Sequence, residues 1–479
     1  MPDRSAGADE PDDRTPVAAP GLSRRGALTS LAIAGAGTLT ACSSTGPAAV
    51  GPATGSPARR GAAASSPTPG AMQLFQDAAM NFNALLALGA AGQHAGEVGE
   101  VLTAVNAINT AGASFQTFTD TFRSWGDRLT RQAERAGREG DEETRRWRSL
   151  RAAQYYGQAL FFVLGTDHPG DEEAVYRAGR RSWDSFAARC RPAALRASVP
   201  WGKTRMPVWF FRPDDAPSPR PTVILTNGSD GQNVDMWTYG VLAATQRGWN
   251  ALVYDGPGQG QLLFVEEIPF SDRWEDVVSP LVDWLRQRTD VDEDRIALAG
   301  LSMAGDLAPR AAAFEHRLAA LVAMPGCVSP WLGFPAEIRK IVTGDKKATN
   351  QIWNEEVVPS LDAAQQFTFK KRLECFSPAA LRAARRGKLP TDFWTPAQRI
   401  EKLDITGVVP QITAPTLVLD YDDEAFYPGQ PQQLYKLLRA PKEYVKLTAA
   451  EGAQLHCSPM APQRHCEVVF DWLADVLHA

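Results

Sequence analysis

Residues 295–305 read RIALAGLSMAG, and this stretch decides the fold. Its first half is a short apolar run typical of a buried strand. Its second half nearly spells G-x-S-x-G, the strand-turn-helix motif that presents a nucleophilic serine. Ser302 holds the serine position, with Gly300 two residues before it and Ala304 two residues after it. Because these flanking residues approach each other in such a turn, both must be small, and alanine adds only one methyl group. The alternative for Ser302 is an ordinary helix N-cap.

The same pattern of an apolar run followed by polar turn residues recurs on both sides of this stretch. Helical stretches separate the runs, and strands that alternate with helices indicate a parallel sheet. In such sheets ligands gather at the carboxyl ends of the strands, and each polar motif named below follows one of these runs. The sequence therefore predicts an α/β protein with a mostly parallel sheet. The other runs lie at 206–213, 221–231, 249–261, 415–424 and 443–456.

The remaining segments have different textures. Residues 72–192 place apolar residues at helical spacing, which predicts a helical N-terminal domain. We expect its aromatic stretch 154–165, QYYGQALFFVLG, to pack against the α/β domain, which runs over 193–479. Residues 327–412 interrupt the strand rhythm with helical stretches and predict a cap over the strand ends. Residues 43–71 are rich in Gly, Pro, Ser and Ala, which predicts a flexible linker.

The first 42 residues are typical of an export signal. Arg24 and Arg25 precede an uncharged stretch, residues 27–41, that is roughly half as long as a membrane-spanning helix requires. The arginine pair suits the twin-arginine route, and LTAC at 39–42 resembles a lipobox in which Cys42 is lipidated. We therefore expect export and a lipid anchor at the outer face of the cytoplasmic membrane, with no other membrane contact. A disordered Ala-rich leader is the alternative.

The bulk composition narrows the classes of function. The chain has 479 residues, of which 44% are apolar and 22% charged, as in a soluble globular protein with an ample core. A net charge of −5 without a basic stripe argues against nucleic-acid binding, so we expect a small-molecule substrate as the partner. The oligomeric state stays open, a homodimer included. The cysteines other than Cys42 are odd in number and widely spaced, which predicts buried thiols and no metal site.

Nucleophilic catalysis by serine requires a base within hydrogen-bond reach and an acid that orients the base. His456 lies on a loop between the last predicted strand and the last amphipathic helix, which is where the chain order Ser, acid, His places the base. His465, inside that helix, is the fallback. The acid should follow the run 415–424, and an acid four residues before a proline selects Glu424. The open alternatives for the acid are Asp420, Asp422 and Asp423.

The developing oxyanion needs backbone N–H donors. The N–H of Met303 would begin the helix after the serine, where the peptide dipoles favour negative charge. TNGSDG at 226–231 ends an earlier strand, so the N–H of Ser229 or Asp230 would be the second donor. The glycine-rich DGPGQG at 255–260 lacks G-x-G-x-x-G spacing and does not predict a nucleotide site. We expect no metal and no organic cofactor.

From about residue 193 onward these motifs resemble an α/β-hydrolase. DGPGQG is a recurring strand-end motif of that superfamily. GLSMAGDLAPRAAAFEHRL, FYPGQ and EGAQLHCSP, together with the preceding helical segment, are similar to the branch that contains the FrsA-like esterases and dihydroxypseudooxynicotine hydrolase. The resemblance implies that Ser302, Glu424 and His456 are the catalytic serine, acid and histidine. Many relatives have Gly-Gly where this chain has Ala304 and Gly305.

The activity that the resemblance implies is that of a serine hydrolase acting on a carboxylic ester or a related acyl compound. Members of this branch also cleave carbon–carbon bonds next to a ketone. Aminopeptidase-type cleavage is a further alternative within enzymes. A catalytically inactive binding lipoprotein is the alternative from another class. The motifs identify the reaction machinery and leave the substrate open.

Overall fold

The computed structural model describes residues 72–478. The predicted export signal, Cys42 and the predicted linker lie outside these residues. Within the described chain, no helix combines the length and the apolar character needed to cross a membrane. Residues 72–478 also contain no group of three or more His, Cys, Asp or Glu side chains arranged to hold a metal ion. The cysteines in this part of the chain are free thiols, and all of them except Cys190 are buried.

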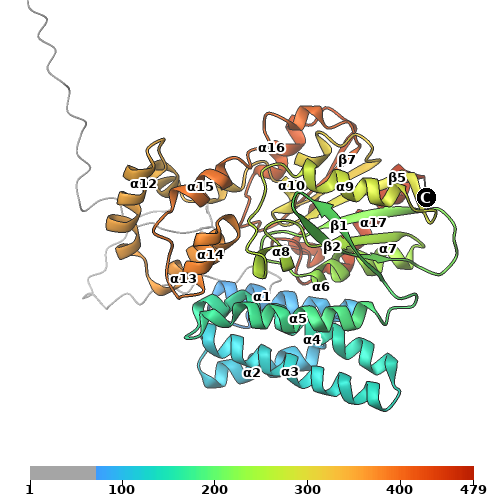
Figure 1. Cartoon of the computed structure of the whole chain (residues 1–479), viewed down its shortest axis with the longest axis horizontal. Coiled ribbons are helices and arrows are strands. Elements are labelled where there is room, and N and C mark those ends of the chain that lie inside the picture. Colours follow the sequence, from blue (N-terminus) through green and yellow to red (C-terminus); the bar gives the residue numbers. More distant parts are fainter. Residues whose placement is uncertain (1–71, 479) are drawn as a thin grey trace, which may run out of the picture. The chain divides into compact units, whose positions relative to one another are not determined.

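An eight-stranded sheet lies at the centre of the described chain, in the order β1-β2-β4-β3-β5-β6-β7-β8 (Figure 1). β1 pairs antiparallel with β2, and β2 pairs antiparallel with β4. The remaining neighbours are parallel, which confirms the predicted mostly parallel α/β sheet. The strands are β1 (Leu195–Trp201), β2 (Thr204–Phe211), β3 (Arg220–Thr226), β4 (Asn250–Tyr254), β5 (Val291–Leu301), β6 (Ala320–Met324), β7 (Thr416–Tyr421) and β8 (Lys442–Leu447).

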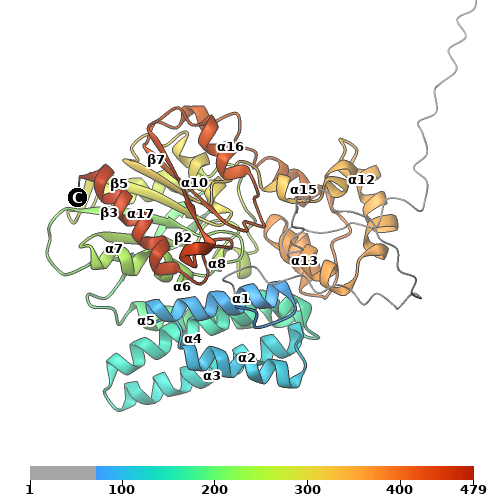
Figure 2. The same cartoon turned by 180° about the vertical axis from the view of Figure 1, so that it is seen from behind.

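Helices cover both faces of the sheet, so its central strands are buried on both sides. Every residue of β4, β6 and β7 is buried, as expected for strands of a doubly covered parallel sheet. On one face lie α9 (Glu275–Arg286) and α10 (Ala304–Ala312), which are in front in Figure 1. On the other lie α7 (Leu242–Gln246) and α17 (Pro462–Leu477), which are in front in Figure 2.

The helical N-terminal segment packs along one side of this core (Figures 1 and 2). Two aromatic side chains of α4 contact the α/β domain as its sequence led us to expect, since the rings of Phe161 and Phe162 lie 6.1 and 5.5 Å from the ring of Phe367. Tyr155 and Tyr156 point back into the helical segment, where their hydroxyls donate to Glu100 and Asp127 at 2.8 and 2.5 Å. The core-facing side of α4 instead carries glutamines and glycine. The helices are α1 (Ala78–Gly89), α2 (Val98–Ala111), α3 (Phe115–Arg138), α4 (Glu142–Phe162) and α5 (Glu172–Ala187).

Between β6 and β7 the chain forms helices, and residues 327–412 contain no strand. These helices pack against the helical N-terminal segment. The ring of Phe367 lies 4.4 Å from the ring of Phe115 in α3, and an ion pair of 2.8 Å joins Arg385 to the buried Glu172 of α5. The main helices of the insertion are α11 (Ala336–Ile341), α12 (Lys346–Ile352), α13 (Ala363–Leu373), α14 (Pro378–Ala384) and α15 (Trp394–Glu401).

Candidate active site

Ser302 lies in a sharp turn between β5 and α10. Its φ is +59°, in the left-handed region that residues with side chains rarely adopt. The backbone N–H of Ser302 donates to the carbonyl of Met324 at 2.7 Å, and its own carbonyl accepts from the N–H of Gly305 at 2.8 Å. A non-glycine residue held in this conformation between a strand and a helix is the strained geometry that exposes a nucleophile.

Two glycines allow the chain to make this turn. A Cβ atom on Gly300 would lie 2.0 Å from the carbonyl oxygen of Ala304, and a Cβ atom on Gly305 would lie 1.8 Å from the carbonyl oxygen of Pro325. The methyl group of Ala304 is itself completely buried in the first turn of α10. The second position that requires glycine is therefore residue 305 and not residue 304, so the departure at Ala304 leaves the turn intact.

Ser302, His456 and Glu424 form a continuous chain of hydrogen bonds. His456 Nε2 lies 2.9 Å from Ser302 Oγ, and His456 Nδ1 lies 2.8 and 3.0 Å from the two carboxylate oxygens of Glu424. Glu424 Oε1 also accepts from the backbone N–H groups of Phe426 and Tyr427. The side chains of His456 and Glu424 are only 6% and 3% exposed, so competing water is largely excluded.

The other candidates for acid and base lie elsewhere. Asp420 accepts from Tyr444 and Gln432, and Asp422 pairs with Lys446 at 2.8 Å. His465 is fully buried in α17, and burial lowers its pKa to about 3. The structure thus brings together the serine, acid and histidine that the motifs selected first. Asp423 lines the cavity that Ser302 faces.

The environment of His456 favours its protonated form. Burial lowers the pKa of His456, but Cys457 and the Glu424 carboxylate raise it more, so the pKa is raised to about 10. Neutral imidazole, which a general base requires, is therefore the minor form at pH 7. The same carboxylate stabilises the imidazolium that forms once a proton has been taken from serine.

The predicted oxyanion donors border Ser302 on two sides. Met303 and Ser229 line one small cavity of about 40 Å³, and Asp230 lines the larger cavity that Ser302 faces. The backbone of the same loop touches the serine, because a Cβ atom on Gly228 would lie 2.7 Å from Ser302 Cβ. The loop after β3 therefore sits where a second donor is needed. Donation to an oxyanion by Met303 with Ser229 or Asp230 stays a prediction.

The DGPGQG loop braces this arrangement, a role that its sequence did not indicate. Gln259 donates from Nε2 to the backbone carbonyls of Asn227 and Gly228, and these hydrogen bonds hold the loop after β3 in place. Asp255 forms a buried ion pair of 2.9 Å with Arg180 of α5. The motif therefore connects the strand end beside the serine to the helical N-terminal segment.

The cap also contributes to the site, through an arginine that the sequence motifs did not identify. Arg372 of α13 forms an ion pair of 2.6 Å with Asp230 and lies over the ring of Phe426. Burial raises the pKa of Asp230, but Arg372 and Lys371 lower it more, so this carboxylate is held ionised. The ring of Phe426 in turn lies 4.4 Å from the imidazole of His456.

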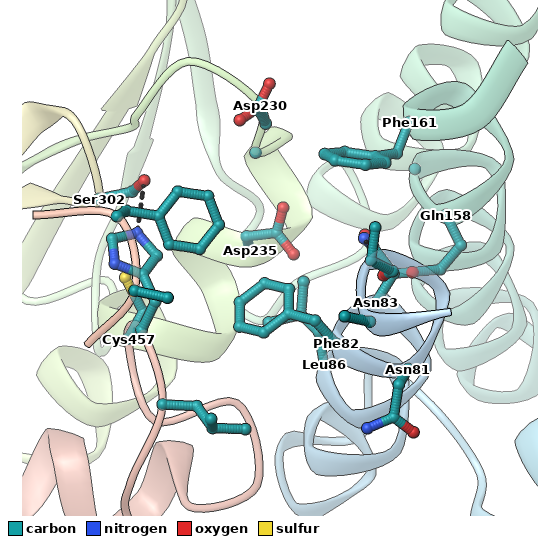
Figure 3. Close-up of a pocket in the computed structure, with 18 of the residues that line it drawn as sticks. Asn81, Phe82, Asn83, Leu86, Gln158, Phe161, Asp230, Asp235, Ser302 and Cys457 are labelled. Atoms are coloured by element: carbon teal, nitrogen blue, oxygen red, sulfur yellow. Dashed lines mark hydrogen bonds between the residues drawn. The ribbon is translucent and has the colours of Figure 1, made fainter. Parts of the chain in front are cut away.

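Ser302 faces a cavity of about 240 Å³ that is lined by α1, α4 and the loops at the strand ends (Figure 3). Phe82, Leu86 and Phe161 supply much of its apolar lining. Part of its polar lining was not identified from the sequence, although glutamines inside the apolar run QYYGQ were a usable signal. These polar side chains include Gln154, Gln158, Asp235 and Tyr239.

The comparisons with known sequences point to hydrolases. The chain is 28% identical over 216 residues to 20-hydroxy-prefusarin hydrolase FUS2 of Gibberella moniliformis, and this match covers 43% of this chain and 51% of that protein. It is 27% identical over 266 residues to hydrolyase poxO of Penicillium oxalicum, and this match covers 52% of this chain and 61% of that protein. The matches thus span about half to three-fifths of these relatives' length. No family model matches the chain.

The comparisons also support the fold. Alpha/beta hydrolase psoB of Aspergillus fumigatus is 28% identical over 229 residues, covering 45% of this chain and 51% of that protein. The crystal structure of a 2,6-dihydroxy-pseudo-oxynicotine hydrolase superposes with a TM-score of 0.59 at 21% identity, covering 81% of this chain and 95% of that one. Together with the sheet order and the turn at Ser302, these similarities show that the chain belongs to the α/β-hydrolase superfamily.

Proposed function

We propose that this chain is a serine hydrolase that cleaves a carboxylic ester or a related acyl compound. Ser302 is the nucleophile, His456 the general base and Glu424 the acid that orients the base. The observation that carries the proposal is the unbroken chain of hydrogen bonds from Ser302 Oγ through His456 to Glu424, at 2.9 and 2.8 Å. The hydrolase names of the relatives support the same reaction class.

The reaction follows from the positions of these groups. Ser302 Oγ attacks the substrate carbonyl carbon while His456 Nε2 takes the hydroxyl proton. The backbone N–H of Met303, with that of Ser229 or Asp230, stabilises the negative oxygen of the tetrahedral intermediate. His456 then gives its proton to the leaving group, and water, activated by the same imidazole, hydrolyses the acyl-enzyme. Glu424 holds the imidazole in place and stabilises the imidazolium.

Fluorophosphonate labelling tests the nucleophile. The wild-type protein should form a stoichiometric covalent adduct on Ser302, and Ser302→Ala should form none. Hydrolysis of p-nitrophenyl acetate should fall by several orders of magnitude in the same variant. A wild-type protein that is folded but not labelled, or equal labelling of Ser302→Ala, would point to the inactive binding protein instead.

The same three residues are compatible with two alternative reactions, carbon–carbon bond hydrolysis next to a ketone and aminopeptidase-type cleavage. A panel of p-nitrophenyl esters, a vinylogous ketone and dipeptide amides separates these reactions. The kcat/KM for the esters should be higher than the kcat/KM for the ketone and for the amides. Faster turnover of the ketone or of the amides would replace ester hydrolysis by that reaction while keeping the same nucleophile.

We further propose that the protein is exported by the twin-arginine route and anchored through a lipid on Cys42. The proposal rests on Arg24, Arg25 and the LTAC sequence. Mass spectrometry of the protein from its native membrane should find the mature chain beginning at a lipidated Cys42. An unmodified N-terminus upstream of Cys42 would contradict it.

A further inference from the structure

Four buried polar side chains of the cavity have no part in the proposed catalytic chemistry. Gln154 and Gln158 project from α4, Asp235 lies in α6 (Asn233–Met236), and Tyr239 lies in the following turn. These residues are 1%, 3%, 8% and 2% exposed. All four line the cavity that Ser302 faces, and Figure 3 shows Asp235 and Gln158 turned toward the space between α4 and the serine.

Three of these side chains carry an atom without a hydrogen-bond partner. Within residues 72–478, Gln154 Oε1, Gln158 Oε1 and the Tyr239 hydroxyl are buried and unpartnered. Most buried polar atoms in native proteins are paired, because an unpaired one loses its hydration without compensation. Two unpaired acceptors and an unpaired hydroxyl that share one cavity therefore point to a ligand that supplies the missing partners.

Asp235 adds a carboxylate to the same group. It accepts from the backbone N–H of Gln232 at 2.7 Å, and among the described residues no Lys, Arg or His forms an ion pair with it. Burial raises the pKa of Asp235 to about 6, although the Gln232 N–H and the Gln154 side chain lower it in part. At neutral pH this carboxylate is mainly ionised. Asp230, on the same cavity, differs because Arg372 already neutralises it.

Apolar side chains line the same cavity. Phe82 and Leu86 of α1 and Phe161 of α4 belong to this lining, and Figure 3 shows them in the space between Ser302 and Gln158. A ligand that spans this cavity needs an apolar body between two polar ends. One end is the carbonyl that Ser302 attacks, and the other meets acceptor oxygens.

We infer that the substrate is an acyl compound with an apolar, ring-sized body and a hydrogen-bond donor, a hydroxyl or an amine, at the end remote from the scissile carbonyl. Asp235, Gln154, Gln158 and Tyr239 receive this donor. The inference rests on the proposed function, because the donor's position is defined relative to Ser302. It assigns substrate specificity to side chains that lie outside the proposed triad.

Matched esters test the inference directly. The probes are p-nitrophenyl 3-phenylpropanoates that carry a para-hydroxymethyl, a para-aminomethyl or a para-ethyl group, which differ in the donor but little in size. For the wild type, kcat/KM should be at least about tenfold higher for one of the donor-bearing esters than for the ethyl ester. If the amine is preferred, Asp235→Asn should reduce that preference more than the preference for the hydroxyl.

Variants show whether the cavity residues cause the preference. Gln158→Met removes the amide at similar volume and should bring the donor-to-ethyl ratio close to one. Gln287→Met, an exposed glutamine of the α9 C-terminus, should keep the wild-type ratio and is the matched control. If Gln158→Met does not fold, Tyr239→Phe removes a hydroxyl that has no partner and should lower the same ratio.

The outcomes separate the two proposals. A wild-type protein that reacts with fluorophosphonate at Ser302 but hydrolyses the three esters equally overturns this inference and leaves the proposed function standing. A donor preference that survives both Gln158→Met and Tyr239→Phe also overturns it. A wild-type protein that neither reacts with fluorophosphonate nor hydrolyses any ester contradicts the proposed function itself.

Discussion

The serine turn has no room for a side chain at Gly305, because the α-carbon of this residue faces the Pro325 carbonyl. We expect Gly305→Ala to lower the free energy of unfolding by about 1–3 kcal/mol, since an added methyl forces the backbone to shift. The shift would also displace Ser302, so esterase activity should fall with stability. Ala304→Gly should cost at most about 1 kcal/mol through helix propensity. Denaturant unfolding and steady-state kinetics measure both effects.

The control for this comparison is Gly99→Ala in α2, where a Cβ atom would meet nothing within 4 Å. This change should stabilise the protein by up to about 1 kcal/mol. A Gly305→Ala protein as stable and active as the wild type would show that the turn relaxes without cost.

His456 makes activity depend on pH in a defined direction. Its pKa is raised, to about 10, so lowering the pH protonates the base and abolishes activity, and kcat/KM should rise with pH well beyond 6.5. Glu424→Gln removes a carboxylate that raises this pKa. The midpoint of the pH profile should therefore fall, and kcat should drop on the order of 10³–10⁴-fold because the imidazolium loses its partner. A pH–rate profile of both proteins measures the two effects.

The same pKa shift has a consequence for stability. A histidine whose pKa is higher in the folded protein stabilises the fold fully below its unfolded pKa, and this stabilisation is lost as the pH rises through the folded pKa. In Ser302→Ala, which cannot turn over substrate, the contribution of His456 to the free energy of unfolding should therefore decline above about pH 6.5.

The preceding prediction on activity has its own contradicting outcome. A pH profile of activity that is unchanged in Glu424→Gln would contradict the role of this carboxylate.

At the scale of single elements, burial decides which strands can be read from the sequence. Every residue of β4 and β7 is buried, and each strand lies within a predicted run. β1 (Leu195–Trp201) was not predicted, because it is an edge strand with mixed exposure and no apolar run. Ser302, Glu424 and His456 could be selected because each follows a recognisable strand. Gln154 and Gln158 were not selected: two glutamines inside an apolar run were a signal, but their role depends on which face of α4 meets the core.

α5 is joined to the core by the buried pair of Arg180 and Asp255, whose side chains are 9% and 2% exposed. Arg180→Met leaves a buried carboxylate without its cation, and we expect a loss of about 3–5 kcal/mol in unfolding free energy. The exposed pair of Arg177 and Glu173 on the same helix provides the control. Arg177→Met should cost no more than about 1 kcal/mol. Equal effects of the two substitutions, measured by chemical denaturation, would show that the buried pair is not special.

At the scale of the whole described chain, the cap and the helical N-terminal segment are one packed unit. Phe367 packs against both Phe115 and Phe162, with ring centroids 4.4 and 5.5 Å away. Phe367→Ala should lower the unfolding free energy by about 3–5 kcal/mol, because a buried aromatic side chain leaves a cavity. Differential scanning calorimetry should show a lower Tm. Phe314→Ala, at a position 42% exposed, should change the Tm little.

The position of Gln154 and Gln158 on α4 separates two properties that many enzymes combine in one set of residues. The proposed chemistry resides in loops at the ends of β5, β7 and β8, whereas the proposed recognition of the substrate's far end includes a helix outside the sheet. Substitutions on that helix can therefore redirect the protein to a new compound while the reacting groups stay unchanged. Diversification of substrate range within such a scaffold then requires changes in a segment that the reaction itself does not constrain.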